Sequence, residues 1–284
     1  MTIDYTYENT RKTVEIGGVT LSWHEAGEGE PLILLHGSGP GVSAWSNFRH
    51  NLPVFARRFR TIMPDMPGFG ASGLPELDDY YATLAARWIA LLMDHLEIGS
   101  ALFTGNSMGG AVVAELAVLH PERVRRMALI GSGGLSVGIF GTDPSEGFLR
   151  LFEFLDDPTR DRMIGWVKTM VYDHRLITDA LIDERMKNAL AEGVIPRMKA
   201  IFGAMFNPAL RRGVAPLWTR SGTIKTPTLL LWGRDDRMLP YDHAHLANRL
   251  LPQVELHSFS RCGHWVQIER KSDFERVSAE FHTR

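Results

Sequence analysis

The sequence predicts an α/β fold, in which a mostly parallel sheet has helices on both faces and a helical cap is inserted into it. Short apolar runs typical of buried strands alternate with helical patterns over the first part of the chain. The alternation stops between about residues 131 and 213, and strand-like runs resume afterwards. We therefore expect a core formed by residues 1–133 and 213–284, and a cap formed by residues 134–212.

The first part of the chain contains six expected strands and three expected helices. Gly17-Gly18 is a hairpin turn signal between the first two strands, and the helix that opens near Ala111 is stopped by Pro121. The expected strands are residues 13–16, 19–23, 32–35, 60–63, 101–103 and 127–130. The expected helices are about residues 44–56, 82–96 and 111–120.

The interval assigned to the cap is rich in large apolar residues at helical spacing. These include Phe148, Leu151, Phe152, Leu155, Met163, Trp166, Met170, Val171, Ile201, Phe202, Met205 and Phe206. An ordinary helical half of the core is the alternative, but it does not explain why strands are expected again at residues 228–232 and 254–259. The last expected helix covers about residues 273–281.

Composition narrows the class of protein. The chain has 284 residues, of which 44% are hydrophobic, enough for a full core. A formal net charge of −2 gives no electrostatic reason to expect nucleic acid or an anionic membrane as a partner. Cys262 is the single cysteine, so an intramolecular disulfide and a cysteine-based zinc site are excluded. Residues 1–12 lack the apolar segment of a signal peptide, so we expect a soluble cytoplasmic protein.

A glycine-flanked serine is the strongest motif. In Gly105-Asn106-Ser107-Met108-Gly109, the serine lies between an expected strand and an expected helix, which is the pattern of the nucleophile elbow of α/β-hydrolases. A Cβ at either glycine would strike a neighbouring strand or helix. The alternative is a turn that merely joins two elements. The motif predicts that Ser107 is a nucleophile.

A serine nucleophile needs a base, and the base needs a carboxylate that orients it. In this fold the acid follows a later strand and the histidine lies near the C-terminus. Asp236 and His264 occupy those places, and the usual spacing favours Asp236 over its neighbour Asp235, which we expect to bond to local backbone or to an arginine. The pair His243 and His245 lacks a third metal ligand, so solvated helix residues are expected there.

Two backbone N–H groups are expected to form an oxyanion hole. One belongs to Met108, directly after the nucleophile, and the other to Ser38, in the loop after the strand at 32–35. The glycines of this loop do not have the spacing of a dinucleotide-binding motif, and Pro40 removes one amide that a phosphate would need.

Taken together, the motifs resemble the meta-cleavage-product hydrolases, which hydrolyse carbon–carbon bonds in bacterial aromatic and steroid degradation. The motifs that carry the resemblance are His36-Gly37-Ser38-Gly39-Pro40-Gly41 with Trp45-Ser46-Asn47, Gly105-Asn106-Ser107-Met108-Gly109-Gly110, Trp232-Gly233-Arg234-Asp235-Asp236-Arg237 and Cys262-Gly263-His264-Trp265. The cap segment at residues 172–178 is similar to the biphenyl-pathway members and brings Arg185 to the position of their cap arginine.

The resemblance implies a small-molecule substrate of the 2-hydroxy-6-oxo-hexa-2,4-dienoate type. It implies tautomerisation of the dienol, followed by hydrolysis of the C5–C6 bond without a metal or an organic cofactor, and a homo-oligomeric enzyme. It also implies that the polar end of the substrate contacts Gly37, Asn47, Asn106, Arg185 and Trp265. From the residues alone, Arg185 would be a solvated helix charge.

Two other classes of function remain open. A carboxylesterase or a cofactor-free haloperoxidase would share the fold and the triad, because fold alone does not choose the chemistry. A non-catalytic ligand receptor on the same scaffold is a more distant alternative, although such a protein would tolerate loss of triad residues and all of them are present here.

Overall fold

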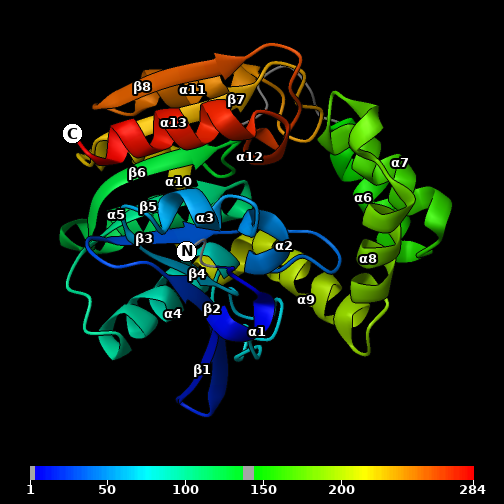
Figure 1. Cartoon of the computed structure of the whole chain (residues 1–284), viewed down its shortest axis with the longest axis horizontal. Helices are drawn as coiled ribbons and strands as arrows, with labels where there is room; N and C mark the ends of the chain where they lie inside the picture. Colours follow the sequence, from blue (N-terminus) through cyan, green and yellow to red (C-terminus); the bar gives the residue numbers. More distant parts are fainter. Residues whose placement is uncertain (1–3, 137–143) are drawn as a thin grey trace.

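The computed structural model describes residues 4–136 and 144–284. Within these residues, eight strands form one sheet in the order β1-β2-β4-β3-β5-β6-β7-β8 (Figure 1). Strand β2 pairs antiparallel with β1 and with β4, and all later pairs are parallel. The strands are Arg11–Ile16 (β1), Val19–Ala26 (β2), Pro31–Leu35 (β3), Arg60–Pro64 (β4), Ala101–Asn106 (β5), Val124–Ile130 (β6), Thr228–Gly233 (β7) and Val254–Phe259 (β8). The expected α/β class is confirmed.

Helices cover both faces of the sheet. They are Tyr7–Thr10 (α1), Ala44–Phe48 (α2), Leu52–Phe55 (α3), Tyr81–His95 (α4), Met108–Leu119 (α5), Leu217–Arg220 (α10), Asp242–Leu250 (α11), Val266–Glu269 (α12) and Lys271–His282 (α13). Alternate residues of a strand point to opposite faces. In β3, Ile33 and Leu35 therefore join one core cluster with α4 and α5, whereas Leu32 and Leu34 join another with α2, α3 and α13.

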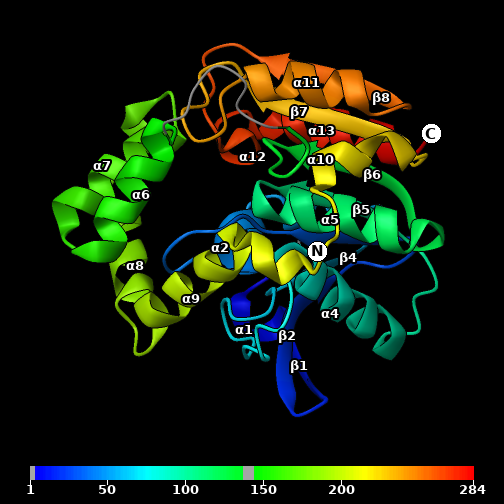
Figure 2. The ribbon, with the colours of Figure 1, turned by 180° about the vertical axis from the view of Figure 1, so that it is seen from behind.

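Between β6 and β7 the described residues form helices and no strand. The four helices Glu146–Asp156 (α6), Arg160–Met170 (α7), Asp179–Ala189 (α8) and Val194–Phe206 (α9) are named the cap helices here. Figures 1 and 2 show α6, α7 and α8 standing beside the sheet, while α9 returns to contact α4. The side chains of Ser145, Thr159 and Thr178 cap α6, α7 and α8 by accepting a backbone N–H of the first turn.

Short 3₁₀ turns complete the architecture. They are Pro121–Arg123 (η1), His174–Leu176 (η2), Pro208–Arg211 (η3) and Ser221–Thr223 (η4). Residues 1–3 of the expected core and residues 137–143 of the expected cap lie outside the described residues. No helix of the described chain is both long enough and apolar enough to cross a membrane.

The expected elements are confirmed with ends that differ by a few residues, except for the single helix expected at 44–56. The structure has two short helices there, α2 and α3. Pro53 lacks the N–H that a continuous helix would donate to the carbonyl of Arg49, and its ring would clash with that carbonyl. The side-chain amide of Asn51 holds the break by donating to the carbonyl of Gln267 and to Glu275.

We expect the protein to lose stability steeply on mild acidification. Burial lowers the pKa of His24 and of His36 to about 4 and that of His282 to about 3, so these rings stay neutral in the folded protein but take up protons near pH 6.5 when it unfolds. Burial also raises the pKa of Asp65 to about 6, which offsets one of the three protons. A net uptake of about two protons makes the free energy of unfolding fall by roughly 3 kcal/mol per pH unit below pH 6.

Urea denaturation at pH 7, 6 and 5 measures this effect. The stability from the histidines is fully present above pH 6.5 and is lost as the pH falls toward 4, so the midpoint urea concentration should decrease at each step. A midpoint that is the same at pH 7 and pH 5 would contradict the expectation.

Candidate active site

Ser107 lies in the sharp turn between β5 and α5. Its backbone conformation (φ 54°, ψ −114°) is one that residues with side chains rarely adopt. The turn is held by the Ser107 N–H, which donates to the carbonyl of Ile130 at 2.8 Å. A Cβ at Gly105 would lie 2.6 Å from the carbonyl oxygen of Gly109, and a Cβ at Gly109 would overlap the carbonyl oxygen of Leu35. The close approach of backbone predicted for these two glycines is confirmed.

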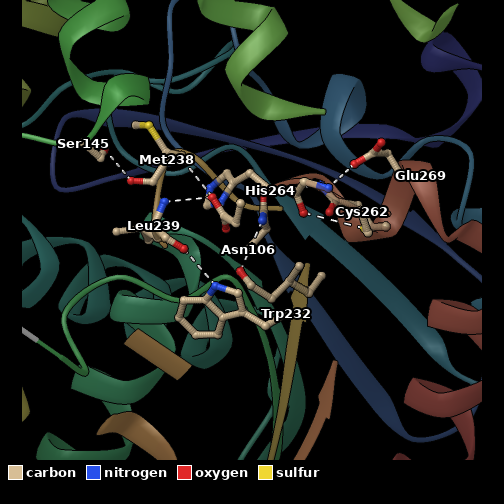
Figure 3. A network of polar contacts seen from close by, with 12 residues as sticks. Asn106, Ser145, Trp232, Met238, Leu239, Cys262, His264 and Glu269 are labelled. Carbon is tan, nitrogen blue, oxygen red and sulfur yellow. Dashed lines mark hydrogen bonds and ion pairs between the residues drawn. The ribbon is translucent and has the colours of Figure 1, made fainter. Parts of the chain in front are cut away.

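His264 and Asp236 form a buried pair after β8 and β7. The His264 Nδ1 lies 2.7 Å from the Asp236 Oδ2, and an ionised carboxylate can only accept, so Nδ1–H donates. The other carboxylate oxygen accepts the backbone N–H groups of Met238 and Leu239 at 2.8 Å each, which fixes its orientation (Figure 3). The His264 Nε2 is buried and has no hydrogen-bond partner in the described part of the chain. Asp236 thus holds the Nδ1 of the ring, and the Nε2 is left to exchange a proton with a reacting group.

The end of β6 brings this pair and Ser107 together. Gly131 follows β6, and a Cβ there would lie 3.0 Å from the Nδ1 of His264 and 3.2 Å from a carboxylate oxygen of Asp236. Two residues later, the N–H of Gly133 donates to the carbonyl of Ser107 at 3.0 Å. The three predicted triad residues therefore lie at one edge of the sheet, where the carboxyl ends of its parallel strands meet.

The loop after β3 lies against Ser107. A Cβ at Gly37 would lie 2.9 Å from the Asn106 Oδ1 and 3.4 Å from the Cβ of Ser107. Ser38, the next residue, is half-buried, and Met108 opens α5, where an N–H has no acceptor within the helix. The two expected oxyanion donors thus belong to segments that meet beside Ser107.

His36 holds this loop in place. Its Nδ1 donates to the carbonyl of Gly37 at 2.7 Å, and its Nε2 accepts the backbone N–H of Met66 at 2.9 Å. Burial keeps the pKa of His36 at about 4, so the ring is neutral at pH 7 and can fill both roles.

Asn106 is enclosed by amide groups from two other elements. Its Nδ2 donates to the carbonyl of Ile130 at 3.3 Å, and its Oδ1 accepts from the Nε2 of Gln267 at 3.3 Å and from the Nδ2 of Asn47 at 3.5 Å. The Oδ1 of Asn47 and the Oε1 of Gln267 are buried without a partner among the described residues. The site therefore keeps unpaired polar atoms beside Ser107. Gln267 was not predicted, because nothing in the sequence distinguishes it from other polar residues of a short helix.

Arg185 is buried, with 6% of its surface exposed, so a solvated helix charge, the expectation from the residues alone, is wrong. Its guanidinium lies 4.4 Å from the centre of the Trp265 ring and 5.8 Å from that of Trp166. Burial lowers its pKa to about 10, which leaves it protonated at pH 7. It forms no ion pair with any described residue, whereas the adjacent Glu184 is held by Arg49 at 2.5 and 2.9 Å. A buried cation without a partner suits an anionic ligand.

Trp166 is a second residue whose place in the site was not predicted. Its indole packs against the loop after β3, because a Cβ at Gly39 would lie 2.6 Å from the Cη2 of the ring. The Nε1 of Trp166 is buried without a partner among the described residues. Helical spacing predicts that such a tryptophan is buried, but it does not indicate whether the ring faces the helical core or the site.

His243 and His245, which were expected to be solvated helix residues, both lie on α11. His243 is half-buried and its Nδ1 is hydrogen-bonded to Ser136, while His245 is exposed and packs on Tyr241. In the described residues, no group of three or more histidine, cysteine, aspartate and glutamate side chains is arranged to hold a metal ion. Cys262 is buried, and burial raises the pKa of its thiol.

Comparison with known proteins points to one family. The family described as alpha/beta hydrolase fold matches residues 30–271. A 2-hydroxy-6-oxo-6-phenylhexa-2,4-dienoate hydrolase of Burkholderia cepacia is 38% identical over 91% of this chain and 89% of that protein. A 2-hydroxy-6-oxo-2,4-heptadienoate hydrolase of Pseudomonas putida is 35% identical over 95% of both chains. The structure of a 2-hydroxy-6-oxo-6-phenylhexa-2,4-dienoate hydrolase from a Rhodococcus species is similar with a TM-score of 0.85 and 29% identity, over 97% of this chain and all of that one.

Proposed function

This chain belongs to the α/β-hydrolase family and, within it, to the meta-cleavage-product hydrolases, and on that premise we propose that it hydrolyses the C5–C6 bond of 2-hydroxy-6-oxo-2,4-dienoates. One observation carries the choice of substrate class. The buried Arg185 guanidinium lies over the ring of Trp265, the residue after His264, and forms no ion pair with a described residue, so it offers a carboxylate a binding place. A simple ester has no group that would need this cation.

The proposed reaction uses His264 as the group that moves protons. The dienol of the substrate is first converted to its keto form, which makes the departing five-carbon fragment a stabilised anion. The Ser107 oxygen then adds to the ketone carbon while the N–H groups of Ser38 and Met108 hold the ketone oxygen. The C5–C6 bond breaks, the five-carbon fragment leaves with the electron pair and takes up a proton, and water hydrolyses the ester left on Ser107. The Nε2 of His264 accepts and returns the protons, and Asp236 stabilises the charged ring. The products are 2-hydroxypenta-2,4-dienoate and a carboxylic acid.

The polar end of the substrate is proposed to lie between the core and the cap. Arg185 would bind the carboxylate in a bidentate manner, with Trp265 supporting the guanidinium. Asn47 and Asn106, whose side-chain amides meet next to Gly37, would contact the polar end of the substrate from the core side. We propose that residues 134–212 act as one cap unit that carries this arginine over the site.

The assay that tests the proposal mixes purified protein with 2-hydroxy-6-oxo-6-phenylhexa-2,4-dienoate and follows the absorbance of the yellow dienolate. Decay of this absorbance by the wild-type protein is the expected result. Turnover of simple esters without decay of the dienolate would assign an esterase instead. Tight binding of the dienoate without turnover would assign a non-catalytic receptor.

Replacing Arg185 with alanine is expected to separate the two substrate classes. The variant loses the cation that pairs with the carboxylate, so kcat/KM for the dienoate should fall by about 10²-fold. For p-nitrophenyl acetate, which has no carboxylate, the change should stay within about threefold. The matched control is Arg150→Ala, since Arg150 is an exposed cap arginine whose one ion-pair partner in the described part of the chain is Glu153, on its own helix. Equal losses on both substrates would remove Arg185 from the carboxylate site.

Two further parts of the proposal depend on the family alone. We propose a homo-oligomer that acts in the cytoplasm on a small-molecule substrate. Light scattering on the purified protein would measure the oligomeric state.

A further inference from the structure

The carboxylate of Glu269 joins the cap to the loop that carries His264. Glu269 ends α12, five residues after the histidine, and it has no part in the proposed chemistry. Its Oε1 accepts the backbone N–H groups of Tyr172 at 2.8 Å and Asp173 at 2.9 Å. Its Oε2 accepts the backbone N–H of Gly263 at 2.5 Å (Figure 3). The first two residues follow the cap helix α7, and the third directly precedes His264.

The last residue of α7 makes a second connection to the same loop. The carbonyl of Met170 accepts the backbone N–H groups of His264 at 2.9 Å and Trp265 at 3.2 Å. The end of α7 and the histidine loop approach so closely that a Cβ at Gly263 would lie 2.8 Å from the carbonyl oxygen of Met170. Three hydrogen bonds at Glu269 and two at Met170 thus fix the histidine loop against the cap.

We propose that Glu269 is a positioning residue: by tying the end of α7 to the backbone before His264, it sets where the imidazole stands relative to Ser107. This inference rests on the proposed function, in which His264 moves the protons. Among the described residues, the His264 side chain has one hydrogen bond of its own, from Nδ1 to Asp236. The remaining precision must come from its backbone, and a misplacement of about 1 Å in a proton-transfer site can cost about 10²-fold in rate.

A carboxylate suits this place better than an amide. All three groups that face Glu269 in these contacts are N–H donors, and they approach both of its oxygens. A glutamine offers one acceptor oxygen and one NH₂ group, so in either orientation it would direct donor hydrogens at an N–H. Glu269→Gln therefore releases one side of the connection while keeping the shape of the side chain.

The test compares Glu269→Gln with Glu115→Gln. Glu115 is also buried, on α5, where Arg220 and Thr83 hold its carboxylate, and none of these hydrogen bonds involves the cap helices or the histidine loop. For Glu269→Gln we expect kcat to fall about 10- to 100-fold on both the dienoate and p-nitrophenyl acetate, with KM within about threefold. Labelling of Ser107 by a fluorophosphonate should slow by the same factor. Glu115→Gln should lose thermal stability and keep kcat within about threefold.

Several outcomes would overturn the inference. One is a folded Glu269→Gln protein with unchanged kcat, and another is a loss confined to KM. If Glu269→Gln does not fold, Glu269→Asp replaces it; this variant keeps both acceptor oxygens but withdraws them by one methylene. A kcat for Glu269→Asp well below that of the wild type supports positioning, whereas a wild-type kcat shows that Glu269 only stabilises the fold.

Because the ester and the fluorophosphonate react with Ser107 without the dienoate, the role of Glu269 can be tested even if the dienoate is not the substrate. If the wild-type protein leaves the dienoate unchanged but reacts with both other reagents, the proposed function fails and the role of Glu269 is still measured. If the wild-type protein reacts with none of the three, both proposals are wrong.

Discussion

Ser107→Ala is expected to lower kcat for the dienoate by about 10⁴-fold or more and to leave the fold intact. The substitution removes only the hydroxyl. Alanine keeps the Cβ, so the strained backbone (φ 54°) and the N–H groups around the turn remain as they are. Measurement of dienolate decay over hours, together with a binding titration, should show a dienoate that is bound but scarcely consumed.

The matched control for this variant is Ser221→Ala. Ser221 is also buried, and among the described residues its hydroxyl donates to the carbonyl of Trp218 and bonds to no triad residue. We expect its kcat to stay within about threefold of the wild type. A Ser107→Ala protein that retains more than about one hundredth of the wild-type kcat would exclude Ser107 as the nucleophile.

The fold could be predicted from the sequence because its signals are local. Apolar runs such as Leu32–Leu35 need only their own residues to indicate a strand covered on both faces. The exception, the break between α2 and α3, depends partly on a contact that no local pattern contains. Asn51 donates to Gln267 and Glu275, which lie at the far end of the chain.

The triad could be predicted for a related reason. In a parallel sheet the ends of successive strands meet at one edge, so residues after β5, β7 and β8 are brought together whatever their separation in the sequence. Arg185 is different, because its neighbours in the sequence are those of a solvated helix, whereas in the fold it is buried and lies over the rings of Trp166 and Trp265. Its role in binding the substrate was predicted from the resemblance to the family and not from its own sequence pattern.

Residues that act through contacts between distant segments were not predicted. Gln267 orients Asn106 across the site, and Glu269 accepts N–H groups from residues nearly a hundred positions earlier. A glutamine and a glutamate in a short helix near the C-terminus have the ordinary pattern of surface residues. Only the fold gives these two side chains their partners, because it places α12 against the end of β5 at Gln267 and against the end of α7 at Glu269.

The second large loss of activity is expected at Asp236, which the sequence favours over the adjacent Asp235 as the residue that orients His264. Asp236→Asn is expected to lower kcat by about 10⁴-fold on the dienoate and on esters alike. The asparagine Oδ1 can still accept the N–H groups of Met238 and Leu239, so the loop should keep its shape. The new NH₂ group, however, donates toward the Nδ1 of His264, so Nδ1 must become the acceptor. The imidazole then carries its proton on Nε2, and Nε2 can no longer accept a proton from Ser107.

Asp235→Asn is the matched control, because the same change is made one residue earlier. Asp235 is exposed, and its carboxylate accepts the backbone N–H of Cys262 at 3.2 Å, a bond that an asparagine oxygen can replace. We expect kcat to change by less than about threefold. Measurement of kcat for both variants at pH 7 therefore decides which aspartate orients the base. A large loss for Asp235→Asn and a small one for Asp236→Asn would reverse the assignment, and equal losses would show that the loop as a whole, rather than one carboxylate, holds the imidazole.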